Sequence, residues 1–150
     1  MISLLYALSV GLMGIFAGTQ IAEGALLVPY WKQLKPADFF ILHQTYGPKI
    51  YRFFAPLTII TTLLSLGTAI YATWVNATGS EAAQVAAVFT LLFFATYPLY
   101  FKKANQQFAD ASISTEALPN ALNRWGQWHW GRVCLEVLAL GAWLTALVQI

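Results

Sequence analysis

The stretch "FFAPLTIITTLLSLGTAIYATWV", residues 53–75, contains no charged side chain. A helix needs about 20 mostly apolar residues to cross the hydrocarbon core of a bilayer, so this stretch is long enough to span it. The whole chain shares this character, because 59% of its 150 residues are hydrophobic and only 9% are charged. Soluble domains carry about 25% charged residues, so the composition indicates a membrane protein.

Three further apolar segments have spanning length. With residues 53–75 they give four approximate spans, at 2–28, 53–75, 82–101 and 129–150. The segments between them leave no room for a separate soluble domain. We therefore expect an all-α fold, an integral membrane four-helix bundle, forming a single domain over residues 1–150. The first segment lacks the basic start of a secretory signal, so we expect it to be retained as a helix.

The basic side chains predict the orientation. All eight lie in or beside the segments that join spans one and two or spans three and four: Lys32, Lys35, Lys49, Arg52, Lys102, Lys103, Arg124 and Arg132. By the positive-inside rule, loops 29–52 and 102–132 are cytoplasmic and both termini lie outside, in what we expect to be a bacterial inner membrane. The net charge of +2 then serves topology and contact with the lipid bilayer, and predicts no nucleic-acid partner.

The first of these loops contains an amphipathic, aromatic segment. Pro36 suits the first turn of a short helix, and Gly47 with Pro48 would end it after about Tyr46. Such a segment is expected to lie along the membrane interface as a short interfacial helix, or to fold over the mouth of the bundle.

Polar residues in the first and fourth spans share helical faces. Gln20 and Glu23 are three residues apart, and Trp125, His129, Arg132 and Glu136 follow at spacings of four, three and four. An ionisable group within a membrane span is costly, so it normally faces the protein interior and is a functional candidate. The candidate catalytic residues are His43, His129, Arg132, Glu23 and Glu136. The candidate ligand-contacting residues are Gln20, Trp31, Tyr46, Arg52, Asn123 and Trp125.

These residue types favour one chemistry and leave others open. His129 or His43 could act as a base, Arg132 could stabilise the resulting anion, and Glu23 or Glu136 could orient the histidine. Tryptophan walls would suit a planar, lipophilic aromatic or quinone-type molecule. This predicts an oxidoreductase or oxygenase-like protein with no favoured cofactor.

Three alternatives stay open. Arg132 could pair with Glu136 or Glu23 only to neutralise a buried charge. His43, His129 and Glu23 could ligate haem or a transition metal. The chain could also be a non-catalytic accessory subunit or a small transporter. Gly14 and Gly18 form a GxxxG pair that we expect to serve packing within the bundle, although a homo-oligomer or a larger membrane complex would use it equally well.

Three blocks carry a family resemblance: "GIFAGTQIAEGALLVPYW" at 14–31, "FFILHQTYGPKIYRFFAPLT" at 39–58 and "NRWGQWHWGRVCLE" at 123–136. In order and spacing they resemble the anthrone oxygenase-like family of small four-helix membrane proteins. The resemblance implies oxidation of polyketide anthrones to anthraquinones without a tightly bound cofactor. It also singles out Glu23, His43, Trp125, His129 and Arg132 as candidate site residues, because they lie in these three blocks.

Overall fold

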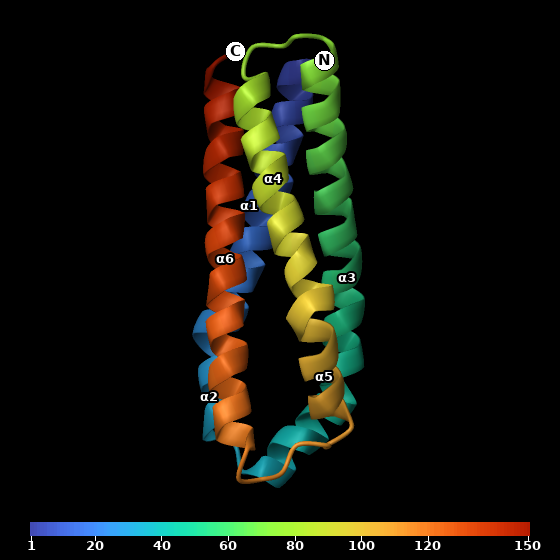
Figure 1. The fold of residues 1–150 in the computed structure, drawn as a ribbon, viewed down its shortest axis with the longest axis vertical. Helices are drawn as coiled ribbons and strands as arrows, with labels where there is room; N and C mark the ends of the chain where they lie inside the picture. The colour runs from blue at the N-terminus through green and yellow to red at the C-terminus, as the bar shows by residue number, and fades with distance from the viewer.

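A computed structural model describes residues 1–150, which form four long antiparallel helical rods and no strand (Figure 1). The rods are Ile2–Gln33, Pro36–Trp74, Ser80–Ala109 and Leu118–Val148, and each is long and apolar enough to cross a membrane. The prediction of an all-α, membrane-spanning four-helix bundle is confirmed.

Two of the rods contain a π-helical turn, whose wider hydrogen-bonded loop shifts the phase of the helix. The first rod is α1 (Ile2–Ala22), η1 (Glu23–Leu27) and α2 (Val28–Gln33), and the second is α3 (Pro36–Trp74) alone. The third is α4 (Ser80–Thr96), η2 (Tyr97–Phe101) and α5 (Lys102–Ala109), and the fourth is α6 (Leu118–Val148). Both termini and the α3–α4 connection lie at one end of the bundle (Figure 1). We call the opposite half, which carries all the lysines and arginines, the basic half.

The half that contains the termini is closely packed by small side chains. Seven of the ten residues of its core cluster are alanines, and they let the four helices approach closely. Buried hydroxyls cross-link the helices, since Ser65 lies 3.0 Å from Thr90 and accepts a bond of 3.2 Å from Trp143 Nε1. This half is therefore a well-filled scaffold, in keeping with the close packing that membrane helices need.

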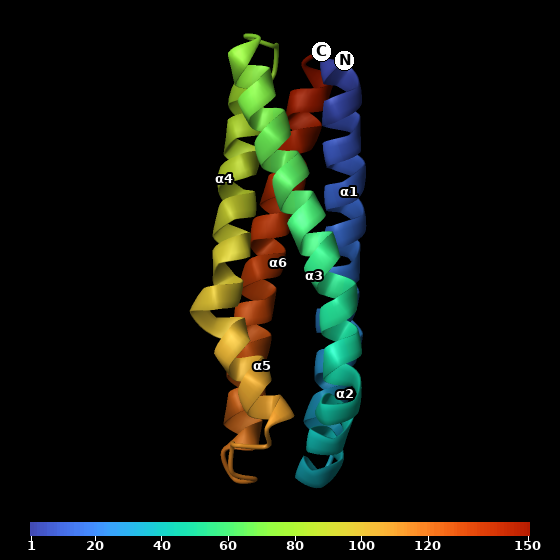
Figure 2. The same ribbon diagram turned by 90° about the vertical axis from the view of Figure 1, so that its right-hand side faces the viewer.

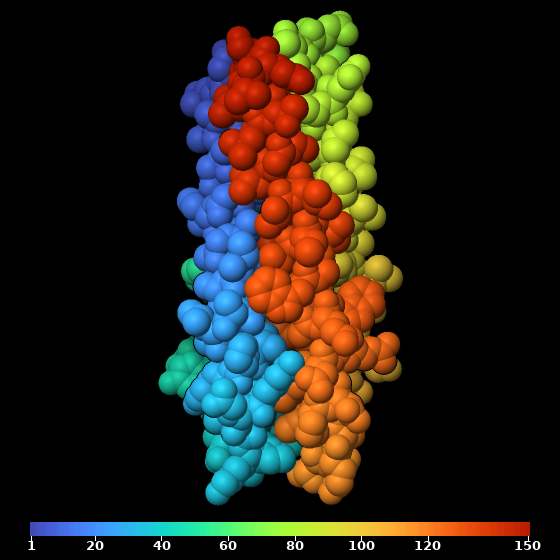
Figure 3. Space-filling model, turned by 90° about the vertical axis from the view of Figure 1, so that its left-hand side faces the viewer, coloured from blue at the N-terminus to red at the C-terminus, as the bar shows by residue number.

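The basic half has an aromatic core of larger side chains. It is built from Val28, Trp31, Phe39, Phe101, Ala104, Phe108, Leu118, Leu122 and Trp125. Several of these rings touch edge to face, and a large cavity lies beside them. On the opposite side α1, α2 and α6 pack against one another (Figure 3), and a second hollow of about 570 Å³ lies there beside Lys32, Asn123 and Trp130.

The predicted short interfacial helix is wrong as a separate element. A helix does begin at Pro36, but it runs through Gly47, Pro48 and Pro56 without interruption to Trp74. Each proline removes one backbone donor, a loss that neighbouring helices and side chains offset in membrane proteins. The first turns of α3 slant across the lower end of the bundle (Figure 1), which agrees with the expectation that this segment covers the mouth.

The predicted long loops are also shorter than expected. Within 29–52 only Leu34 and Lys35 lie outside a helix, and within 102–132 only residues 110–117 do. The helices extend beyond the apolar spans because the aromatic core of the basic half continues to bury one face of each helix after the charge-free stretch ends.

The GxxxG pair does not pack inside the bundle, contrary to the prediction. A Cβ on Gly18 would meet no atom within 4 Å, and one on Gly14 would meet only Leu140, at 4.0 Å. The close approach occurs instead at Gly24 in η1, where a Cβ would lie 2.8 Å from Cδ2 of His129. Gly24 therefore lets the first rod pack directly against α6 at the level of the polar residues.

Candidate functional site

A buried polar network joins η1 and α1 to α6. Its centre is Arg132, whose Nη2 donates to Gln20 Oε1 at 2.8 Å and to Glu23 Oε2 at 3.1 Å. Glu23 is 5% exposed and Arg132 is 11% exposed. Of the two carboxylates that could partner Arg132, it is therefore Glu23, on another helix, that forms the ion pair.

His129 belongs to the same network and has no free nitrogen. Its Nε2 lies 2.8 Å from the backbone carbonyl of Gln20, which can only accept, so Nε2 carries the proton. The unprotonated Nδ1 then accepts from Arg132 Nη2 at 2.9 Å. The ring is fully buried and stacks on Trp125, with centroids 5.1 Å apart. In this arrangement His129 orients Arg132 and cannot take a further proton unless Arg132 moves away.

Glu136 lies one helical turn beyond Arg132 and is 1% exposed. Neither of its carboxyl oxygens has a hydrogen-bond partner, and the Nε of Arg132 also lacks one. An unpaired buried carboxylate would be very costly in a membrane, so we interpret Glu136 as a neutral carboxylic acid. It does not line the cavity described next.

A cavity of about 550 Å³ occupies the basic half, between α3 and the third rod. This volume falls in the range of pockets that bind small organic molecules, roughly 300–1,000 Å³. Gln20, Glu23 and Arg132 provide a polar wall, and Trp31, Phe54, Phe93 and Trp125 are among the aromatic residues of its other walls. The network around Arg132 is thus the inner wall of a ligand-sized space.

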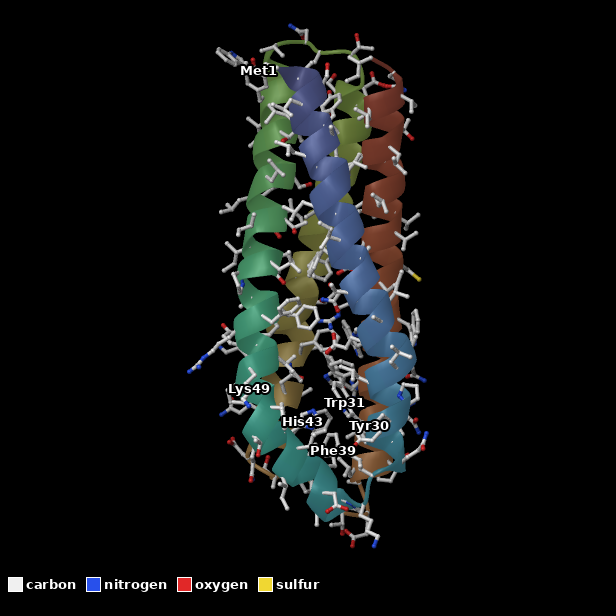
Figure 4. All side chains as sticks on the ribbon, turned by 180° about the vertical axis from the view of Figure 1, so that it is seen from behind. Met1, Tyr30, Trp31, Phe39, His43 and Lys49 are labelled. Carbon is white, nitrogen blue, oxygen red and sulfur yellow. The ribbon has the colours of Figure 1, made fainter.

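His43 faces this cavity from α3 and differs from His129 in its hydrogen bonds. Its Nδ1 lies 3.3 Å from the Phe39 carbonyl, so the neutral ring carries its proton there. Its Nε2 makes no hydrogen bond within the protein and remains an acceptor at the cavity wall. Figure 4 shows His43, Trp31 and Phe39 gathered between α2 and the lower part of α3, with Lys49 pointing away.

Six of the predicted site residues line the cavity together: Gln20, Glu23, Trp31, His43, Trp125 and Arg132. The other five do not. His129 lies behind Arg132, and Glu136 is buried deeper along α6. Tyr46 and Arg52 are exposed outside the cavity, and Asn123 lines a separate shallow groove beside Lys32 and Trp130.

The position of Tyr46 follows from the continuity of α3. His43, Gly47, Ile50, Tyr51 and Phe54 line the cavity at spacings of three and four, as one helical face. In an unbroken helix this face passes from His43 to Gly47 and turns Tyr46 outward. The prediction had assumed that the helix ends there.

Sequence reasoning missed the contribution of the third rod. Tyr97, Lys102, Asn105, Gln106 and Ala109 all line the cavity, and Asn105 accepts a bond of 2.8 Å from Trp125 Nε1. Lys102, Asn105, Gln106 and Ala109 have helical spacing, a signal that was available in the sequence. The polar composition of residues 102–132 predicts a loop instead, and that prediction masks the helical spacing.

The alternative metal-ligand set is not assembled. His43 contacts Trp31, Trp31 contacts Trp125, and Trp125 stacks on His129, so two indole rings link the imidazoles instead of a shared space. The chain holds no group of three or more histidine, cysteine, aspartate or glutamate side chains arranged to hold a metal ion. The geometry therefore does not fit His43, His129 and Glu23 as ligands of one haem iron or metal.

Comparison with known proteins adds no further assignment. No protein-family model, no curated protein and no solved structure matches this chain.

Proposed function

We propose that the protein binds a planar, lipophilic aromatic or quinone-type molecule in this cavity and acts on it as an oxidoreductase of the oxygenase-like kind. The observation that carries the proposal is a 550 Å³ space with aromatic walls and two separate hydrogen-bonding groups, Arg132 with Glu23 on one wall and His43 on another.

The two polar groups lie at different depths. His43 is at the level of Trp31 and Trp125, which touch one another, and Arg132 follows Trp125 by seven residues on α6. The Arg132 side chain turns back along α6, so its guanidinium carbon lies 5.7 Å from the centre of the Trp125 ring. His43 is reached from there across the Trp125 and Trp31 rings, so a fused aromatic molecule lying along these rings can accept from Arg132 with one oxygen while another group donates to His43.

The proposed chemistry uses His43 as the base. Its free Nε2 takes a proton from a phenol or from the activated CH₂ of an anthrone, leaving a delocalised anion whose oxygen is stabilised by Arg132. The Nη1 of Arg132 makes no hydrogen bond within the protein and is available for this contact. Reaction of that carbanion with dioxygen, and loss of water, would convert the CH₂ to the carbonyl of an anthraquinone. This reaction is the one that the family resemblance implies, and its two substrates are an anthrone and dioxygen.

The charge distribution also supports an orientation. We propose that the basic half faces the cytoplasm of a bacterial inner membrane and that both termini lie outside, because all lysines and arginines lie at one half of the bundle. The cavity would then open in the cytoplasmic leaflet, where lipophilic products of cytoplasmic enzymes partition.

Ligand binding is tested with protein in lipid nanodiscs, titrated with an anthraquinone and with a benzoquinone while tryptophan fluorescence is recorded. Quenching should be reduced in Trp31→Phe and lost in Trp31→Phe/Trp125→Phe, since both indoles line the cavity, and kept in Trp130→Phe, whose side chain is 43% exposed outside it. Quenching that both variants retain equally would place the ligand elsewhere and would contradict the proposal.

Catalysis is tested separately by oxygen uptake with an anthrone. His43→Gln should abolish turnover above the uncatalysed rate while ligand affinity changes little. Arg132→Gln should weaken both, and Arg52→Gln, at an exposed cation outside the cavity, is the matched control. Binding without turnover in the unaltered protein would favour the accessory-subunit or transporter alternatives.

A further inference from the structure

The cavity has an opening toward lipid, along the seam between α3 and the third rod. Ile59 on α3 and Phe94 on α4 both line the cavity and are also among the exposed residues, at 50% and 41% of their surfaces. Tyr51 is 56% exposed and faces Tyr97 across the same seam, with ring centroids 6.3 Å apart. Figure 2 views this side of the bundle.

The other walls are closed. Gln20, Glu23, Trp31, Phe93 and Trp125 are each 5% exposed or less. On the third rod, the π-helical turn η2 determines which residues reach the seam, because Tyr97 and Lys102 both line the cavity although they are five residues apart. Five residues is the spacing of one π-helical turn. The turn is visible in Figure 2 as the bulge between α4 and α5.

The opening changes character along its length. Near its basic end it is bordered by the exposed polar residues Lys102, Asn105 and Gln106. Farther in, Ile59 and Phe94 belong to the charge-free stretches that cross the membrane. A water-soluble ligand would need only the polar part. The cavity thus has a polar wall inside and an apolar opening toward the hydrocarbon region. This arrangement suits a molecule with an aromatic head and an apolar tail.

We propose that the natural ligand is such an amphiphile, a quinone or phenol with an alkyl or isoprenoid tail, whose head occupies the cavity and whose tail passes between Ile59 and Phe94 into the bilayer. The proposal rests on the proposed function, because it requires the aromatic head to bind beside Trp31 and Arg132. It adds the class of ligand and the path by which the ligand enters from the membrane.

The test compares decylubiquinone with its tailless parent benzoquinone in nanodiscs, using Trp31-dependent quenching. The double variant Ile59→Trp/Phe94→Trp narrows the seam and should weaken decylubiquinone binding about tenfold, within the range that overpacking produces, while the tailless parent changes by less than about twofold. The control is Ile60→Trp/Leu92→Trp, which adds the same bulk at neighbouring exposed sites that do not line the cavity.

Unchanged decylubiquinone affinity, or an equal loss for both ligands, would overturn the tail path while leaving head binding intact. Failure of both quinones to bind the unaltered protein would instead refute the proposed function, and the inference with it. As a measurement independent of the variants, decylubiquinone with a photoreactive group on the tail carbons nearest the ring should label residues 51–59 and 94–97. Displaceable labelling confined to other helices would contradict the proposal.

Discussion

The ion pair between Arg132 and Glu23 should be strongly cooperative, and a double-mutant cycle measures this. Arg132→Met removes a cation whose Nη2 contacts Glu23 Oε2 at 3.1 Å, Gln20 Oε1 at 2.8 Å and His129 Nδ1 at 2.9 Å. It leaves the Glu23 carboxylate buried without a cation, which costs about 3–5 kcal/mol in comparable buried pairs. Glu23→Gln removes the charge but keeps an oxygen acceptor, so its cost should be nearer 1.5–3 kcal/mol, that of one hydrogen bond to a charged group.

The double variant should be less destabilised than the sum of the two single variants. Once Arg132 is absent, Glu23→Gln relieves an unpaired charge and should restore stability instead of reducing it. The expected interaction energy is therefore larger than the cost of about 1.5–3 kcal/mol for Glu23→Gln alone, well above the average of roughly 0.6 kcal/mol for hydrogen bonds between membrane helices. The excess reflects the charge of both partners and their burial, at 5% and 11% exposure.

The assay is reversible unfolding of the protein in mixed micelles, followed by far-ultraviolet circular dichroism. Arg52→Met is the matched control, since it removes an exposed cation that forms no ion pair with any carboxylate. It should change stability by less than about 0.5 kcal/mol. Additive effects of Arg132→Met and Glu23→Gln would refute the interpretation of the network as one coupled unit.

Three further outcomes are expected. Gly24→Ala should lower the free energy of unfolding by about 1–3 kcal/mol, since the new Cβ would meet His129 at 2.8 Å. Gly18→Ala, whose Cβ would meet no atom within 4 Å, should be neutral or slightly stabilising in the same unfolding assay. Trp125→Phe should lose the bond to Asn105, cost about 1 kcal/mol in thermal denaturation and weaken quinone binding, and an unchanged affinity would remove Trp125 from the site. His129→Gln should reduce thermal stability, and it should weaken ligand affinity because Arg132 loses a partner, while anthrone turnover is retained. Complete loss of turnover in a normally folded variant would show that His129, and not His43, is the base.

The sequence predicted the helices better than it predicted where they end. A charge-free stretch such as residues 53–75 is long enough to span a membrane, and a helix satisfies all of its backbone groups in lipid. The Gly47–Pro48 pair gave the usual signal of a helix end, and the helix continues because its Phe39 and His43 face packs against Trp31 and Phe108. That packing is a tertiary effect, which local sequence signals do not record.

The sequence predicted those residues of the candidate site that lie on the same face of one helix. Spacing alone aligned Gln20 with Glu23, and Trp125 with Arg132, and these residues do meet. The sequence left Glu136 and Glu23 as alternative partners of Arg132, and the geometry between helices joins Arg132 to Glu23. The hydrogen bonds that occupy both nitrogens of His129 and leave one free on His43 depend on the same packing, so the roles of the two histidines could not be separated from sequence.

The central claim is that all four rods, the first rod, the lower part of α3, the third rod and α6, build one cavity for a planar aromatic molecule. A structure of the protein in nanodiscs with a bound anthraquinone tests this most directly. The account predicts ring density beside Trp31 and Trp125, with one oxygen in hydrogen-bonding contact with Arg132 and the other end of the molecule facing His43. Ring density confined to the outer surface, with the cavity empty and Arg132 unchanged, would contradict it.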